Sequence, residues 1–267
     1  MPRRGWPLYS VLAFGYAFLY VPVILLVVYS FNASRLVTVW GGFSTKWYAA
    51  LLENQQLLDA AWLSVRIAAV NATVAVVLGT LAANALVRHG RFRGRTGFDL
   101  LLTAPLVMPD VIIGLSLLLL FVAMQQAIGW PAGRGFTTIA IAHITFSMAY
   151  VAVVVKSRLG QMDRSLEEAA MDLGARPLTV YLRITLPLIA PALLSGWLLA
   201  FTLSLDDLVI ASFVAGPGST TLPMVVYSSV RMGVSPQINA LASLIVLFVS
   251  LAVIVAGLAM SRRGAGR

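Results

Sequence analysis

Three carboxylates lie within long apolar runs of the sequence, where charged side chains are rare. Asp110 lies in the run Leu100–Ile128, and Asp206 and Asp207 lie together in the run Leu188–Val214. Neither run contains a lysine or an arginine that could pair with them. An aspartate at the centre of a membrane-spanning helix costs about 2.5 to 3.5 kcal/mol on insertion scales, so each one should face protein or water. Together the three acids suit a dication, whose two ammonium groups need compensating negative charge as they lose water.

The positions of these aspartates indicate different depths in a membrane. Asp110 lies ten residues into its run, or about 15 Å at 1.5 Å per residue, which places it near the middle of a bilayer. Consecutive helical residues point about 100° apart, so Asp206 and Asp207 are not both expected to face one lumen. We predict that Asp110 and at least one of the other two line a substrate pathway. The alternative is that they cap helix breaks or pair with an arginine of a partner protein.

A second feature with chemical meaning is the polar stretch Lys156–Pro187, which separates two apolar runs. It contains Glu168-Ala169-Ala170, then three residues, Gly174, then nine residues and Ile184-x-Leu186-Pro187. Ala169 and Ala170 carry little bulk, so the surface of another protein could approach them closely. The stretch is therefore a candidate docking site, and the alternative is an ordinary capped loop between membrane helices.

The local signals within this stretch predict two short helices joined by a bend. Ser165 and Glu168 have the spacing of a capping box, in which each side chain satisfies a free backbone amide of the first turn. Gly174 suits the left-handed residue that ends such a helix. Pro177 suits the first turn of the next helix.

The elements that must position these residues are membrane spans. The 267 residues are 60% hydrophobic and 11% charged, with a mean hydropathy of +0.90, whereas soluble domains carry about 25% charged residues. Spanning a hydrocarbon core takes about 20 helical residues. The segments that qualify are Leu8–Phe31, Ile67–Val87, Leu100–Ile128, Phe136–Val155, Leu188–Val214 and Ile238–Met260. We predict an all-α membrane protein with six transmembrane helices in one domain, 1–267.

Local composition within the spans adds three expectations. The second span is rich in small residues and should face other helices, because lipid provides no hydrophobic drive for packing. Pro105 and Pro109 should break the third span just before Asp110. His143, among small polar residues of the fourth span, is expected to be a hydrogen-bonded packing residue rather than a ligand.

The basic residues lie mainly in short loops on one side of this map. The N-terminus, the loop after the second span, the 156–187 stretch and the C-terminus hold fourteen of the 19 lysines and arginines, against four on the other side: Arg35, Lys46, Arg134 and Arg231. The positive-inside rule then places both termini and the 156–187 loop in the cytoplasm. The net charge of +9 is thus an orientation signal, and no nucleic-acid partner is expected.

Several other chemistries are excluded by the residue inventory. The chain has no cysteine, so it has no disulfide, thiol catalysis or cysteine metal site. Neither lysine, Lys46 or Lys156, follows a glycine as a phosphate-binding loop requires. Any ATP hydrolysis must therefore come from another chain. No internal repeat is evident, which argues against the inverted-repeat secondary transporters.

The spacing of the 156–187 stretch resembles the E-A-A-x3-G-x9-I-x-L-P loop of the membrane subunits of ATP-binding-cassette (ABC) importers, and all seven specified positions match. Other runs resemble the polyamine (putrescine) branch of these permeases: SFNASRLVTVWGGFSTKWY, TAPLVMPDVIIGLSLLLLF, GWLLAFTLSLDDLVIASFVAGPGSTTLPM and SSVRMGVSPQINALA. Together they extend along nearly the whole chain.

This resemblance implies the six-helix type I importer (MetI-like) fold and a multi-pass protein of the bacterial inner membrane. It implies a heterodimer with a homologous permease, two ATPase subunits that bind ATP and Mg, and a periplasmic polyamine-binding protein. The implied mechanism is alternating access: ATP closes the ATPase dimer, the E-A-A helices are drawn together, and the outer gate opens. Coupling to the ATPase falls on Glu168, Ala169, Ala170 and Gly174. The chain itself needs no cofactor and is not an enzyme.

Two alternatives remain open from the sequence. The substrate could be spermidine or another cation rather than putrescine. The chain could also be an ATP-independent carrier or channel, with the intramembrane carboxylates as proton or cation sites.

Overall fold

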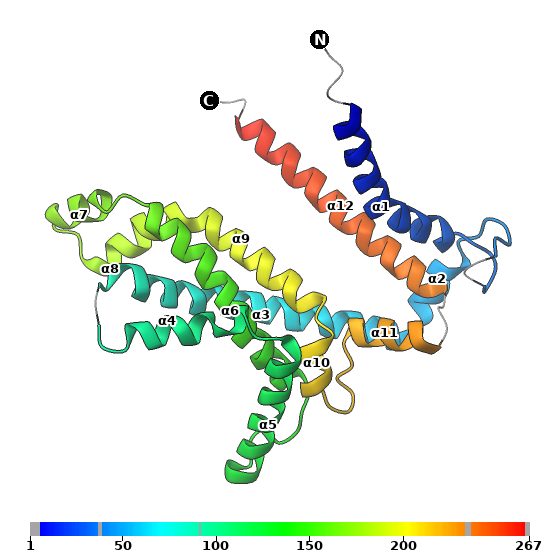
Figure 1. Ribbon diagram of the computed structural model, residues 1–267, viewed down its shortest axis with the longest axis horizontal. Coiled ribbons are helices and arrows are strands. Elements are labelled where there is room, and N and C mark those ends of the chain that lie inside the picture. The colour runs from blue at the N-terminus through cyan, green and yellow to red at the C-terminus, as the bar shows by residue number, and fades with distance from the viewer. Residues whose placement is uncertain (1–5, 37–38, 91, 233–235, 265–267) are drawn as a thin grey trace. The chain divides into compact units, whose positions relative to one another are not determined.

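A computed structural model describes residues 6–36, 39–90, 92–232 and 236–264, with side chains for residues 9–36, 39–90, 92–231 and 236–251. The described residues are almost entirely helical, which confirms the predicted all-α class (Figure 1). The chain divides into two compact units. The smaller unit consists of 1–58 and 226–267, and the larger unit is 59–225.

The smaller unit is built on three helices: α1 (Trp6–Ser30), α2 (Lys46–Glu53) and α12 (Pro236–Gly264), with α12 packed against α1 and α2. Asn32 orders the connection between α1 and α2. Its Nδ2 donates to Leu36 O and Val39 O, and its Oδ1 accepts from the backbone N–H groups of Ser34 and Gly41. Because the side chain is almost fully buried, these bonds hold the loop in one conformation.

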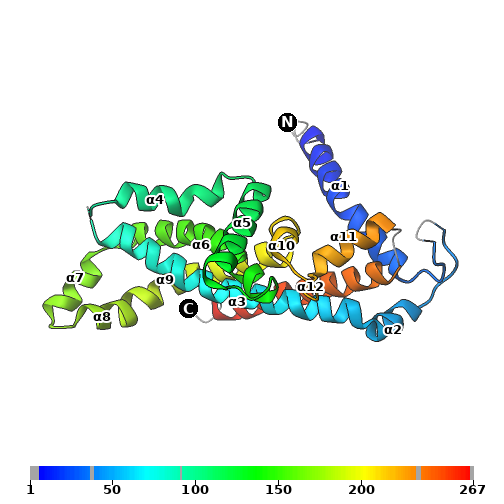
Figure 2. The same ribbon diagram turned by 90° about the horizontal axis from the view of Figure 1, so that it is seen from below.

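The larger unit contains the remaining elements. They are α3 (Gln55–Arg88, which begins in the smaller unit), α4 (Arg95–Thr103), η1 (Ala104–Leu106), α5 (Asp110–Ile128), α6 (Phe136–Gln161), α7 (Ser165–Asp172), α8 (Pro177–Val180), η2 (Tyr181–Thr185), α9 (Leu186–Leu205), α10 (Val209–Val214) and α11 (Leu222–Met232, which ends in the smaller unit). Within this unit α6 packs against α9, and α10 packs against α5 and α6. In both views α7 and α8 form one end of the unit (Figures 1 and 2).

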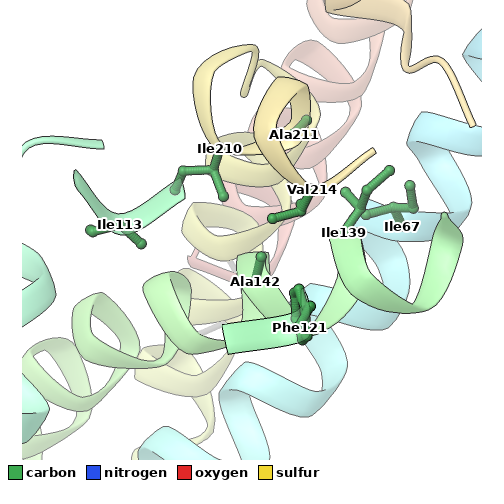
Figure 3. Packing of buried hydrophobic residues seen from close by; sticks show 8 residues of the cluster. All are labelled: Ile67, Ile113, Phe121, Ile139, Ala142, Ile210, Ala211 and Val214. Atoms are coloured by element: carbon green, nitrogen blue, oxygen red, sulfur yellow. The ribbon is translucent and has the colours of Figure 1, made fainter. Parts of the chain in front are cut away.

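The core of the larger unit has an apolar cluster and a small-residue layer. The cluster joins α3, α5, α6 and α10 through Ile67, Ile113, Phe121, Ile139, Ala142, Ile210, Ala211 and Val214 (Figure 3). On α3, Ala68, Ala72, Ala75 and Ala83 have no exposed surface. The prediction that the second span faces other helices is thus confirmed, because small side chains let helices approach closely.

Five described helices are long and apolar enough to cross a membrane: Tyr9–Ser30, Gln55–Arg88, Asp110–Ile128, Phe136–Gln161 and Pro177–Leu205. The sixth predicted span lies on α12, where the described apolar part is the shorter helix Pro236–Leu251. The residues of the predicted sixth span beyond 251 have no described side chains. Five of the six predicted spans therefore coincide, in order, with described helices that are long enough to cross a membrane, and the sixth falls on this shorter helix.

Two predicted spans are interrupted. The run Leu100–Ile128 is not one helix, because Pro105 lies in a short 3-10 turn and Pro109 precedes α5. Asp110 is therefore the first residue of its spanning helix rather than a residue ten positions inside one continuous helix, and its depth near mid-bilayer stays a prediction. In the run Leu188–Val214, α9 ends at Leu205, and α10 begins only after Asp206, Asp207 and Leu208.

Candidate functional site

The predicted docking loop forms a helical hairpin, α7 followed by α8. Gly174 has φ +84°, the left-handed conformation expected for it. Its N–H donates to Met171 O at 2.8 Å, and the N–H of Ala175 donates to Ala170 O at 3.1 Å. These two bonds make a Schellman ending, which satisfies the last free carbonyls of α7. Pro177 opens α8 as its first residue, so the sequence prediction of two short helices and a bend is confirmed.

The predicted start of α7 is wrong in detail. Ser165 is already the first helical residue, and no side chain of the predicted Ser165–Glu168 capping box makes a capping bond. Asp163 makes the capping bond instead, because its Oδ1 accepts the N–H of Ser165 at 2.9 Å. This backbone bond, with a smaller contribution from the Ser165 hydroxyl, holds the pKa of the Asp163 carboxyl below its ordinary value.

The surface of the hairpin carries the other residues singled out from the sequence. Glu168 and Ala169 are exposed, and Ala170 is half-buried. Leu173, at the tip, is 90% exposed, and Leu166 and Met171 are also exposed. Leu166, Met171 and Leu173 thus leave apolar surface uncovered on this hairpin.

Asp207 is held by bonds from two helices. His143 of α6 places Nε2 3.1 Å from Asp207 Oδ2, and its Nδ1 lies 2.7 Å from Ser204 Oγ. A carboxylate only accepts, so we assign the ring proton to Nε2. Asp207 also accepts the N–H groups of Ile210 at 3.3 Å and Ala211 at 2.7 Å. The aspartate therefore caps the helix break, as the structural alternative predicted, and His143 is the hydrogen-bonded packing residue expected.

Asp110 and Asp206 are placed differently from Asp207. Asp110 is exposed at the first turn of α5, where the helix dipole favours negative charge. Asp206 is the exposed C-cap of α9, next to Asp207 in the chain and close enough to His143 to interact with it electrostatically.

Close packing of α5 on α10 brings the helix that starts with Asp110 against the helix that Asp207 caps. A Cβ added to Gly114 of α5 would lie 2.7 Å from the ring of Phe213 and 3.2 Å from Ile210 Cα. Glycine at this position is therefore what allows the two helices to meet.

The sequence did not identify Glu167, which lies next to the motif residue Glu168 but points into the fold. Its carboxylate contacts Arg88 and Thr185, far away in the sequence. Nothing in the local pattern distinguishes it from Glu168, since both are acidic residues of the first turn.

Comparisons with known proteins agree with this arrangement. The family model described as "Binding-protein-dependent transport system inner membrane component" matches residues 75–262. The putrescine transport system permease protein PotI of Escherichia coli (strain K12) is 64% identical over 260 residues, covering 97% of this chain and 92% of that protein. The spermidine/putrescine transport system permease protein PotC of the same strain is 44% identical over 247 residues, covering 92% and 90%.

Solved structures share the fold at low sequence identity. A chain of a bacterial ABC transporter involved in the import of the acidic polysaccharide alginate aligns with a TM-score of 0.72 at 16% identity, covering 98% of both chains. A chain of the inward-facing MetNI methionine ABC transporter aligns with a TM-score of 0.60 at 16% identity, covering 77% of this chain and 94% of that one. The fold is that of the type I ABC importer permeases. By family match and by identity over nearly its whole length, this chain belongs to the binding-protein-dependent transport system inner membrane components.

Proposed function

We propose that this chain is a permease subunit of an ATP-driven polyamine importer, with putrescine as the substrate. It receives the cation from a periplasmic binding protein and passes it to the cytoplasm by alternating access. The 64% identity to a putrescine permease over 97% of the chain supports putrescine as substrate. The protein lies in the bacterial inner membrane with both termini in the cytoplasm, and ATP and Mg are bound by a separate ATPase.

The observation that carries the proposal is the α7–α8 hairpin. It combines the E-A-A-x3-G spacing with a Gly174-ended helix that exposes Ala169 and Leu173 to solvent. A surface on which the small side chain of Ala169 lies near an exposed leucine can enter an apolar groove of an ATPase subunit. Coupling by Glu168, Ala169, Ala170 and Gly174 then requires two such hairpins, one from each permease of a heterodimer, and two ATPase subunits.

The substrate pathway is assigned to the acids at the helix breaks. Asp110 and Asp206 are the better candidates for contact with the substrate, because the carboxylate of Asp207 is already engaged by His143 and the start of α10. Two separate carboxylates suit the two ammonium groups of a diamine.

Spermidine is the second candidate substrate, favoured by the 44% identity to a spermidine/putrescine permease. An ATP-independent carrier or channel is the alternative from another class, favoured only by the intramembrane carboxylates.

The test is reconstitution of the complete complex with its binding protein, followed by measurement of ATP hydrolysis with each polyamine. We expect putrescine to give the largest stimulation. A larger stimulation by spermidine would identify spermidine as the substrate instead of putrescine. Uptake that continues without the ATPase would contradict the importer mechanism.

A further inference from the structure

Glu167 joins the docking hairpin to two membrane-spanning helices. Its Oε2 lies 3.2 Å from Arg88 Nε, at the last residue of α3, and the side chains are only 15% and 12% exposed. Its Oε1 accepts the hydroxyl of Thr185 at 2.7 Å. Thr185 is 2% exposed and immediately precedes α9. The carboxylate of Glu167, in the first turn of α7, thus contacts both the last residue of α3 and the residue that precedes α9.

A backbone contact strengthens the connection to α3. Arg164, just before α7, donates from Nη2 to the carbonyl of Val87 at 2.6 Å. Arg88 depends on the charge of Glu167 in turn, because its Nε and Nη2 are both buried and neither makes a hydrogen bond among the described residues. Removing one partner of a largely buried ion pair leaves its charge uncompensated, so Arg88 and Glu167 are expected to stay together when α7 moves.

The two halves of the hairpin connect to the membrane helices in different ways. The helix α8 continues through the π-helical turn η2 into α9 as one apolar helical stretch, Pro177–Leu205. By contrast, α7 is joined to α6 by the non-helical link 162–164 and ends at the Gly174 bend, so side-chain contacts are needed to connect it to α3 and α9. A cavity of about 410 Å³ lies between the hairpin and the end of α3. It is lined by residues of α3, α7, α8 and η2, and these include Arg88, Glu167 and Tyr181.

We propose that Glu167 is a positioning residue for coupling: it transmits displacement of the docking hairpin to the ends of α3 and α9. The inference rests on the proposed docking of this hairpin to an ATPase. Glu168 and Glu167 then have separate tasks, since Glu168 is exposed and open to a partner, whereas Glu167 contacts Arg88 and Thr185. Loss of the Glu167 contacts leaves docking intact but weakens the connection of α7 to the end of α3 and to Thr185, so that α7 can move without moving α3, while α8 still continues into α9.

The experiment uses the complete reconstituted complex and compares wild type with Glu167→Gln and Thr185→Val. Glu167→Gln removes the charge that compensates Arg88, and Thr185→Val removes one hydroxyl at nearly constant volume. We expect ATPase-subunit binding and basal ATP hydrolysis within about twofold of wild type. Putrescine transported per ATP hydrolysed should fall by about fivefold or more, the lower end of typical coupling effects.

Exchanging the two charges tests whether transport per ATP depends on the ion pair itself. The double variant Arg88→Glu with Glu167→Arg restores the pair with its partners reversed, and the Thr185 oxygen can accept from the new guanidinium. We expect it to recover transport per ATP relative to either single change. The matched control is Glu53→Gln, an exposed acid of the smaller unit, which should leave transport per ATP at the wild-type value.

Two results would overturn the proposal. One is wild-type transport per ATP in both Glu167→Gln and Thr185→Val. The other is loss of ATPase-subunit binding in Glu167→Gln, which would make Glu167 part of the docking surface. If the hairpin does not dock on the ATPase at all, a complex with Gly174→Val should show normal uptake, which distinguishes that failure from failure of the Glu167 proposal.

Discussion

His143 of α6 and Asp207, which follows α9, pair across the break between α9 and α10, with Nε2 3.1 Å from Oδ2. The histidine is 2% exposed, and the aspartate side chain is 11% exposed. The same carboxylate accepts two backbone N–H groups of α10. These three hydrogen bonds together hold Asp207 at the break in the fifth spanning segment.

Replacement of His143 by leucine should destabilise the protein. The change removes the ring N–H from a buried carboxylate and leaves Ser204 without its partner, which costs about 1 to 3 kcal/mol for an unsatisfied buried group. Thermal unfolding of the purified protein in detergent should show a lower Tm. His89→Leu is the matched control, since His89 is exposed. Equal Tm values for the two variants would contradict the role given to the pair.

Asparagine at position 110, 206 or 207 should lower polyamine uptake, because each change removes one negative charge from the proposed pathway. The effect should be larger at Asp110 and Asp206 than at Asp207, whose carboxylate is already bonded. Uptake of labelled putrescine by membrane vesicles measures it, with Asp59→Asn, an exposed acid elsewhere on α3, as control. Variants that fail to assemble with the partner permease would instead make these acids structural.

Gly174→Val should insert into the membrane normally but lose uptake. Position 174 has φ +84°, which a β-branched residue adopts only with strain of about 1 to 3 kcal/mol, so the α7–α8 bend should change. The space around the glycine is open, so the loss comes from backbone conformation and not from a clash. Gly160→Val, also in open space but without a positive φ, is the control. Normal uptake at normal abundance by the position-174 variant would rule out the docking role.

Gly114→Val should separate α5 from α10. The added side chain meets Phe213 and the Ile210 backbone, and overpacking of this kind costs about 1 to 3 kcal/mol. A lower Tm and reduced uptake are expected together, because both aspartate-bearing breaks lie at these helices. Gly97→Val on α4, where a Cβ meets nothing, should change the Tm much less. The same Tm for both variants would show that the close approach at Gly114 contributes little.

Orientation in the membrane can be tested by cysteine labelling, since the chain has no cysteine of its own. With both termini inside, a cysteine at Gly218 should react with an impermeant reagent in intact cells. One at Gly160 should react only after permeabilisation, and both positions are exposed. Arg91, a further predicted cytoplasmic position, lies outside the described residues. The reverse pattern of labelling would require the predicted map to be inverted.

The sequence alone determined the features that depend on local chemistry. Hydropathy located the spanning helices, because burial in lipid requires long apolar runs whatever the packing. The residue spacing identified the hairpin, and Gly174 and Pro177 marked its bend because few other residues adopt those backbone conformations. Pro109 likewise placed a break before Asp110.

Only the tertiary structure decided which side chains meet. Asp207 and His143, like Glu167 and Arg88, come from elements far apart in the sequence, and no spacing rule relates residues brought together by packing. The start of α7 was mistaken for a similar reason: Asp163 and Ser165 can both cap a helix, and the backbone path decides which one precedes the first turn. The roles of Glu167 and Asp207 therefore follow from helix packing, whereas the hairpin and the spans follow from residue type and order.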